Sequence, residues 1–151
     1  MSEIVSDRPR IVVGVDGSDG SKTALRWAQR LARAEHATIE VVAAWEFPAT
    51  LGWSALPTDY SPRVDVEKTA NAVVDAVFGG HRPASLQVVT RQGHPVEVLL
   101  DAASGALLLV VGSRGHGGFS GLLLGSVSAR VAERATCPVL VVHGEFPAAA
   151  G

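Results

Sequence analysis

The stretch Ala106–Ser128 reads ALLLVVGSRGHGGFSGLLLGSVS and decides the fold. An unbroken apolar run, Ala106–Val111, precedes a glycine-rich segment, and a cluster of small residues, Gly125–Ser128, opens a helical pattern. The predicted order is therefore a buried strand, a glycine-rich loop and the start of a helix. Backbone N–H groups and a helix N-terminus in this arrangement can gather around phosphate oxygens. The stretch indicates a nucleotide-binding site, with ATP as the favoured ligand.

Strand and helix patterns alternate along the rest of the chain. Short apolar or β-branched runs predict strands at Arg10–Val15, Thr38–Trp45, Leu86–Thr90, Leu107–Val111 and Pro138–Val142. Apolar residues at helical spacing predict helices from the turn Asp16–Ser21 to about Ala34, over Val64–Phe78, from Pro95 to about Ser104, and over Val127–Arg134. Apolar strands separated by helices predict an α/β fold, a doubly wound open parallel five-stranded sheet with helices on both faces. Ligands bind such sheets outside the carboxyl ends of the strands, where the strand order reverses.

Length and composition predict one globular domain over residues 1–151, with a structured core from about 9 to 144. A net charge of −2 without a basic run argues against nucleic acid as a partner, and two lysines provide no polybasic patch for a membrane surface. The N-terminus shows no secretory signal, and no apolar run approaches the roughly 20 residues of a membrane span, so we expect a cytoplasmic protein. Cys137 is the only cysteine, and we expect it to be a small buried residue rather than a reactive thiol.

The glycines of the loop have a physical reason. A backbone that wraps a triphosphate needs residues without a Cβ between amide and oxygen. Six positions within fourteen residues satisfy this need: Gly112, Gly115, Gly117, Gly118, Gly121 and Gly125. Ser126 and Ser128 add hydroxyl donors at the start of the helix, and Arg114 is the one fixed cation of the loop.

Two standard phosphate motifs are absent. The pattern G-x-x-x-x-G-K-[ST] fails because the loop contains no lysine. The dinucleotide pattern G-x-G-x-x-G begins at Gly115 and Gly117 but ends on Ser120. Both interpretations are therefore rejected.

The spacing Gly112-x₂-Gly115-x₉-Gly125-Ser126 resembles the nucleotide-binding signature of the universal stress protein family, G-2x-G-9x-G-(S/T). The resemblance extends over nearly the whole chain. The opening strand and its acidic turn, Ile11–Ser18, the turn Gly93–Pro95 and the closing strand Cys137–Val142 all resemble family features. It implies a Rossmann-like sheet of strand order 3-2-1-4-5 and an ATP-binding regulator of the stress response.

Site residues follow from the resemblance. It implies that Gly14, Val15 and Asp16 border the adenosine, and that Ala44 offers backbone groups to the adenine. The segment Gly112, Ser113, Arg114, Gly115, His116, Gly117 and Gly118 would wrap ribose and phosphates, and Gly125, Ser126, Val127 and Ser128 would hold the phosphate tail. The long segment Glu46–Pro62 matches no motif, and its role, in closing the site or as a plain surface connection, stays open.

Asp16 has three interpretations. A carboxylate beside a polyphosphate is repelled unless it faces base, ribose or Mg²⁺. We favour contact with ribose or base, and place Mg²⁺ second. The third interpretation is a turn or N-cap aspartate.

Catalytic residues are not predicted. His116 fits a solvated loop residue or a phosphate hydrogen-bond donor better than an acid–base group, and the remaining histidines lack metal-ligand spacing. Phosphoryl transfer needs a carboxylate that holds Mg²⁺, a cation near the phosphate and a positioned base. Asp16 could be the carboxylate and Arg114 the cation, but the sequence shows no obvious base. We expect nucleotide binding with slow or no hydrolysis and no metal site made of protein ligands. A weak ATPase or phosphotransferase using the same pocket is the alternative.

The last strand, Pro138–Val142, indicates a partner. An uncharged apolar edge strand is an aggregation hazard unless it is paired or covered. We expect a homodimer through this strand, as the resemblance also implies. The alternative is an edge shielded by Phe146 and the C-terminal tail.

Overall fold

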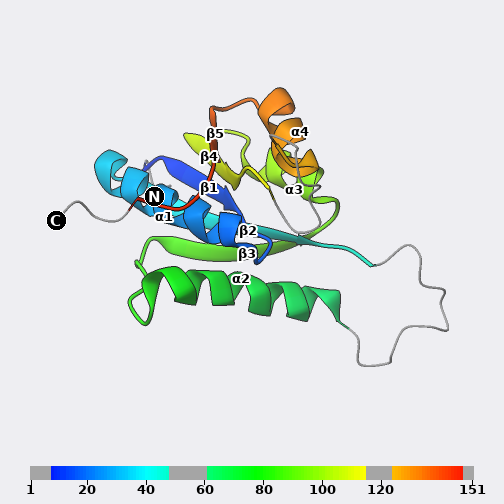
Figure 1. Cartoon of the computed structure of the whole chain (residues 1–151), viewed down its shortest axis with the longest axis horizontal. Coiled ribbons are helices and arrows are strands. Elements are labelled where there is room, and N and C mark those ends of the chain that lie inside the picture. Colours follow the sequence, from blue (N-terminus) through cyan, green and yellow to red (C-terminus); the bar gives the residue numbers. More distant parts are fainter. Residues whose placement is uncertain (1–7, 48–60, 115–123, 148–151) are drawn as a thin grey trace, which may run out of the picture.

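Strands and helices alternate without exception in the computed structural model, which describes residues 8–47, 61–114 and 124–147 (Figure 1). The strands are β1 (Arg10–Gly14), β2 (Thr38–Trp45), β3 (Leu86–Gln92), β4 (Leu108–Gly112) and β5 (Val139–Val142). The helices are α1 (Asp19–Glu35), α2 (Pro62–Phe78), α3 (Pro95–Ala102) and α4 (Ser126–Arg134). All strand pairs are parallel, in the order β3-β2-β1-β4-β5. The predicted fold class and strand order are confirmed.

Strand ends differ from the sequence predictions by one or two residues. β3 continues to Gln92, and the Gly93 N–H donates to the carbonyl of Trp45 at 2.8 Å, so the pairing of β2 with β3 persists beyond the apolar run. β5 begins at Val139 because Pro138 has no N–H to give to a ladder. Leu107, predicted as the first residue of a strand, lies just before β4 and is exposed.

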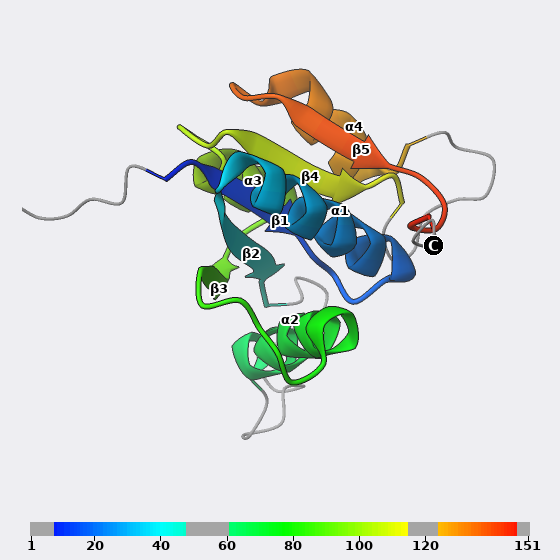
Figure 2. The same cartoon turned by 90° about the vertical axis from the view of Figure 1, so that its left-hand side faces the viewer.

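Two hydrophobic cores cover the two faces of the sheet. Successive strand side chains point to opposite faces, so Val13 joins the core under α1 and α2 while Val12 joins the core under α3 and α4. Both valines are fully buried. Figure 2 shows α1 in front of the sheet and α4 behind it. Burial on both faces explains why these strands are apolar runs instead of alternating patterns.

The helix starts follow local chemistry in three of four cases. Ser18 caps α1 and Ser61 caps α2, each accepting a hydrogen bond from a backbone N–H of the first turn. His94 caps α3 through its side chain and is followed by Pro95 at the first helical position, as predicted. α4 begins after Gly125, which has no side chain that could cap it.

Strand order reverses between β1 and β4. The chain leaves β1 toward β2 and β3 on one side, whereas β4 continues to β5 on the other. Ligands bind to doubly wound sheets beyond the carboxyl ends of the strands at such a point, and we call this region, beyond the ends of β1 and β4, the crevice. Each helix of the described segments is too short or too polar to cross a membrane.

Candidate functional site

The predicted site residues outside the loop gather at the carboxyl edge of the sheet. Gly14 ends β1 and Gly112 ends β4, the two neighbouring strands at the switch point. Gly125 and Ser126 open α4, which follows β4 in the chain. Gly115, His116, Gly117 and Gly118 lie outside the described residues, so their contacts with a nucleotide stay predictions.

Gly112 and Gly20 bring two backbones into contact. A Cβ atom on Gly112 would lie 2.9 Å from the carbonyl carbon of Gly20 and 3.1 Å from its Cα. A Cβ atom on Gly20 would lie 2.9 Å from the carbonyl oxygen of Arg114. The first turn of α1 therefore lies directly on the end of β4. Sequence reasoning assigned Gly112 to the ligand and treated Gly20 as a turn residue, because nothing local to either one reveals the contact.

Gly14 makes room for a helix on the opposite face. A Cβ atom there would lie 2.8 Å from Cδ1 of Leu99, a buried residue of α3. Glycine at this position is therefore explained by packing. A contact between Gly14 and adenosine stays a prediction.

Asp16 is held in a network of hydroxyl groups. Its Oδ1 accepts hydrogen bonds from the Ser18 N–H (3.0 Å), the Ser18 hydroxyl and the Ser21 hydroxyl (2.6 Å). The Asp16 N–H in turn donates to the Ser21 hydroxyl oxygen at 2.8 Å. Ser21 is 3% exposed, so the network anchors the turn between β1 and α1 in the protein. The turn interpretation of Asp16 is thus realised, and the contact with ribose, base or Mg²⁺ stays a prediction.

The ends of the glycine-rich loop are tied together. The Gly125 N–H donates to the carbonyl of Ser113 at 2.6 Å. The Ser128 hydroxyl lies 2.9 Å from the same carbonyl oxygen and 3.1 Å from the carbonyl oxygen of Gly125. Ser128 is 3% exposed. Its hydroxyl hydrogen is therefore used within the chain, and a contact of this hydroxyl with phosphate would have to replace one of these bonds.

The first turn of α4 lies at this edge of the sheet. Ser126 is exposed, while Val127 packs against the core under α3 and α4. No side chain caps this helix in the described part of the chain. The N–H groups of a first helical turn have no partner within their own helix, and the helix dipole gives them partial positive charge. This end of α4 is suited to an anion.

Two further predicted residues lie beside the crevice. The Val15 N–H donates to the carbonyl of Val42 at 3.0 Å and continues the pairing of β1 with β2. Ala44 is half-buried near the end of β2, packs on the core under α3 and α4, and pairs in register with Arg91 of β3. Its predicted contact with adenine is not tested by this arrangement.

Shifted pKa values lie away from the crevice. The Arg134 hydrogen bond, at 2.7 Å, lowers the pKa of Glu97, and burial raises the pKa of Cys137. Cys137 is half-buried against the core under α3 and α4, so the expectation of a buried residue holds only in part. Within the described ranges, no three His, Cys, Asp or Glu side chains form a group that could hold a metal ion.

Comparison with known proteins agrees with this architecture. A model of the universal stress protein family matches residues 8–143. A universal stress protein of Thermus aquaticus is 38% identical, over 88% of this chain and 97% of the relative. A universal stress protein of Mycolicibacterium smegmatis is 34% identical over 92% of this chain. The aligned region covers 49% of that relative, so this chain spans about half of the relative's length. The crystal structure of a universal stress protein in complex with cAMP superimposes with a TM-score of 0.62 at 35% identity, covering 89% of this chain and 96% of the other.

Proposed function

The chain belongs to the universal stress protein family, and from this premise we propose that it binds ATP in the crevice between the carboxyl ends of β1 and β4. It acts as a cytoplasmic, nucleotide-dependent regulator in the stress response. The observation that carries the proposal is the closed base of the glycine-rich loop: Ser113 and Gly125 are hydrogen-bonded to each other directly before α4 begins. Ser113 and Gly125 thus lie next to a helix N-terminus for which residues 61–114 and 124–147 provide no side-chain cap.

The choice of an adenine nucleotide has two supports. The related structure at 35% identity holds cAMP, an adenine nucleotide. The signature Gly112-x₂-Gly115-x₉-Gly125-Ser126 is complete in this chain, and it is the ATP-binding form of the family pattern that it resembles. Because a triphosphate carries more negative charge than a cyclic monophosphate, the dipole of α4 stabilises it more strongly.

We favour a protein that binds ATP and hydrolyses it slowly or not at all. Phosphoryl transfer needs a carboxylate for Mg²⁺, a cation on the phosphate and a positioned base. Asp16 lies two residues after the end of β1, and its Oδ1 accepts hydrogen bonds from Ser18 and Ser21. An Mg²⁺ ion that accompanies ATP would therefore be held mainly by the phosphates. Slow hydrolysis in the same pocket is the alternative activity.

Substitution of Ser126 by aspartate tests the site. An added carboxylate in the first turn of α4 favours the helix dipole but repels phosphate. We therefore expect Ser126→Asp to keep or raise the melting temperature while it weakens ATP binding at least tenfold in a calorimetric titration. Thr136→Asp, which adds the same charge at an exposed position after the other end of α4, is the matched control and should bind ATP as the parent chain does. Equal ATP affinities of the parent chain and Ser126→Asp would show that the phosphates of ATP do not bind at the N-terminus of α4.

Mass spectrometry of the protein purified without added nucleotide gives a second test. Co-purified ATP, ADP or AMP would support the proposal. Titrations with ATP, GTP and cAMP then compare affinities: ATP against GTP tests the preference for the base, and ATP against cAMP tests the preference for the phosphate chain. Preference for GTP would contradict the assignment of an adenine nucleotide.

We also propose a homodimer through β5. The carbonyls of Pro138 and Val142 accept hydrogen bonds from the N–H groups of Leu109 in β4 and of Ser113 just after it. The alternation along a strand therefore turns the backbone groups of Val139 and Val141 toward the open edge. Phe146 packs against Trp27 of α1 with ring centroids 5.2 Å apart, and shielding of the edge by Phe146 and the C-terminal tail is the alternative. A second copy pairing with this edge would satisfy its exposed donors and acceptors.

Val141→Pro is the test of the dimer. It removes an outward N–H but no hydrogen bond to β4, so we expect a folded monomer by light scattering, with the fold checked by circular dichroism. Val141→Lys provides a second variant that places a charge at the edge strand. Unchanged dimers in both variants would move the interface elsewhere.

A further inference from the structure

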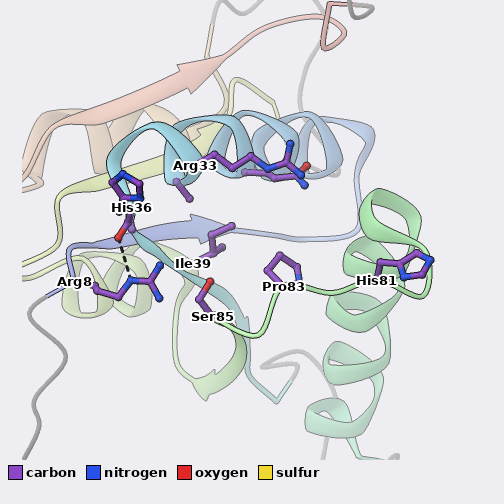
Figure 3. A pocket seen from close by; sticks show the side chains of 10 residues that line it. Arg8, Arg33, His36, Ile39, His81, Pro83 and Ser85 are labelled. Atoms are coloured by element: carbon purple, nitrogen blue, oxygen red, sulfur yellow. Dashed lines mark hydrogen bonds between the residues drawn. The ribbon is translucent and has the colours of Figure 1, made fainter.

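A second groove lies at the opposite edge of the sheet from the nucleotide crevice. It has a volume of about 460 Å³, within the range of small-molecule sites. It runs between the C-terminal half of α1 and the segment that enters β3 (Figure 3). Its lining residues include Arg8 before β1, Arg33 on α1, Ile39 on β2, and Pro83 and Ser85 before β3. We call it the amino-edge groove, because these residues lie at or before the amino ends of the strands.

Charge in the amino-edge groove has one sign. Arg8 and Arg33 contribute guanidinium groups from separate segments, and none of the ten residues that line the groove is acidic. The imidazoles of His36 and His81 also line it. The Nε–H of Arg8 donates to the carbonyl of His36 at 3.2 Å, which ties the segment before β1 to the end of α1. The hydrogen bond holds Arg8 beside the left-handed turn at His36 (φ 53°), which ends α1.

The floor of the amino-edge groove is apolar. Ala32, Ala37 and Ile39 are 7%, 3% and 3% exposed, and they belong to the core under α1 and α2. Pro83 adds a half-buried ring from the opposite wall. Figure 3 shows Ile39 between Arg33 above and Ser85 below. A ligand of this groove therefore needs an anionic group and an apolar body.

We propose that the amino-edge groove binds a small phosphate monoester with an apolar or aromatic body. Guanidinium groups suit phosphate oxygens because they offer paired N–H donors in a fixed plane. A phosphate monoester carries a charge of about −1.5 to −2 at neutral pH, so it gains more from a lining with basic and no acidic side chains than a carboxylate with a single charge. The Ser85 hydroxyl and the Gln29 amide are polar groups within the same lining.

This site does not depend on the proposed function. Its residues lie at the amino ends of the strands, while Gly14 and Gly112 end β1 and β4 at the carboxyl edge. Arg33 has a competing structural explanation, because a cation in the last turn of α1 also complements the carbonyl end of the helix dipole. The two explanations differ in what a substitution of Arg33 changes: ligand affinity in one case and only stability in the other.

Titration with phenyl phosphate, followed by amide NMR shifts, distinguishes a ligand-binding role of Arg33 from a purely stabilising one. We expect saturable shifts at Ala37, Ile39 and Ser85. Arg33→Gln should weaken phenyl phosphate binding about tenfold, the loss expected for one charge-assisted hydrogen bond. Arg63→Gln, which removes an exposed arginine on α2 outside the groove, is the matched control and should bind as the parent chain does.

The readout also distinguishes the two sites of the molecule. Shifts confined to Gly112, Ser113 and Gly125 would place the phosphate in the nucleotide crevice and overturn the proposal. Unchanged affinity in Arg33→Gln would overturn it too, and would leave the helix-dipole role. Benzyl alcohol, a neutral probe of similar size, should bind at least tenfold more weakly than phenyl phosphate, and equal binding of the two would reduce the groove to an apolar depression.

Discussion

The N-termini of α1 and α4 follow the ends of the neighbouring strands β1 and β4, yet the chain treats them in opposite ways. α1 is closed by its own side chains, since Ser18 caps the helix and Asp16 and Ser21 brace the turn. α4 begins after Gly125, without a side-chain cap in the described residues. A self-capped helix end contributes to stability, whereas an uncapped one leaves its N–H groups for another partner. The difference separates a structural end from a candidate binding end.

The start of α1 also packs on the end of β4. Gly20 in the first turn of α1 lies against Gly112 at the end of β4, backbone to backbone. The contact positions α1 beside the crevice without placing a side chain in it. Backbone packing of two glycines thus holds the start of α1 against the end of β4.

Gly112→Ala should have the largest effect, because it forces these two backbones apart. The new methyl group would lie 2.9–3.1 Å from backbone atoms of Gly20, which cannot rotate away as a side chain could. We expect a loss of about 3 kcal/mol in the free energy of unfolding, measured by urea denaturation. Gly80→Ala is the control, since nothing lies within 4 Å of a Cβ atom there, and it should change stability by less than about 1 kcal/mol. A tolerated Gly112→Ala would show that the contact does not constrain α1.

Ser18→Ala tests the closed end directly. It removes the cap that accepts the Ser21 N–H at 3.2 Å and the hydroxyl donor to Asp16. We expect the free energy of unfolding to fall by about 1–2 kcal/mol. Ser126→Ala, the comparable change at the first residue of α4, should leave stability of the unliganded protein within about 0.5 kcal/mol. Equal losses in the two variants would erase the distinction between the two helix ends.

Ser128→Ala sharpens the description of the open end. The variant loses the hydroxyl that bridges Ser113 and Gly125, although both carbonyls keep another hydrogen bond, from the Gly125 N–H and the Ala129 N–H respectively. We expect a loss of about 1 kcal/mol by thermal or urea denaturation. ATP binding should weaken as well, because the base of the loop is no longer held closed. Ser104→Ala, at an exposed position after α3, serves as the control and should change neither quantity.

The smallest effect is expected at the far end of α4, where Arg134 pairs with Glu97 of α3 at 2.7 Å. The hydrogen bond from Arg134 lowers the pKa of Glu97, so the pair stabilises the fold above the ordinary glutamate pKa and loses its effect as pH falls through the lowered value. The melting temperatures of Glu97→Gln and the parent should therefore differ slightly at pH 7 and converge toward pH 3. Both groups are exposed, so roughly 1 M salt should shrink the difference at pH 7. A difference that grows on acidification would contradict the assigned direction.

Element type was predictable from the chain because burial on both faces leaves a local signature. Runs such as Arg10–Gly14 and Leu108–Gly112 contain no polar side chain in their interior, and short apolar runs of this kind are typical of strands that are buried on both faces. The helix start at Pro95 was predictable for the same reason, since first-turn preferences act within a few residues, whereas α2 begins at Pro62, two residues before the predicted Val64. The loop spacing led to the family because every fixed glycine is encoded in one contiguous stretch.

Contacts between distant segments were not predictable. The partner of Gly112 is Gly20, and the neighbour of Gly14 is Leu99, neither of which shares a motif with it. Ser128 looked like a phosphate donor in the sequence, whereas burial places its hydroxyl against Ser113 and Gly125. Whether a hydroxyl faces a ligand or a carbonyl depends on packing, which no local pattern states.

The amino-acid sequence by itself determined the alternation of strands and helices, the parallel sheet and the glycine signature, because each rests on preferences of neighbouring residues. Only the tertiary structure decided which glycines serve backbone contact, which serine braces the loop, and that Arg8, Arg33 and Ser85 surround one groove. These features join segments that are far apart in the chain, and their energies exist only after the sheet has brought those segments together.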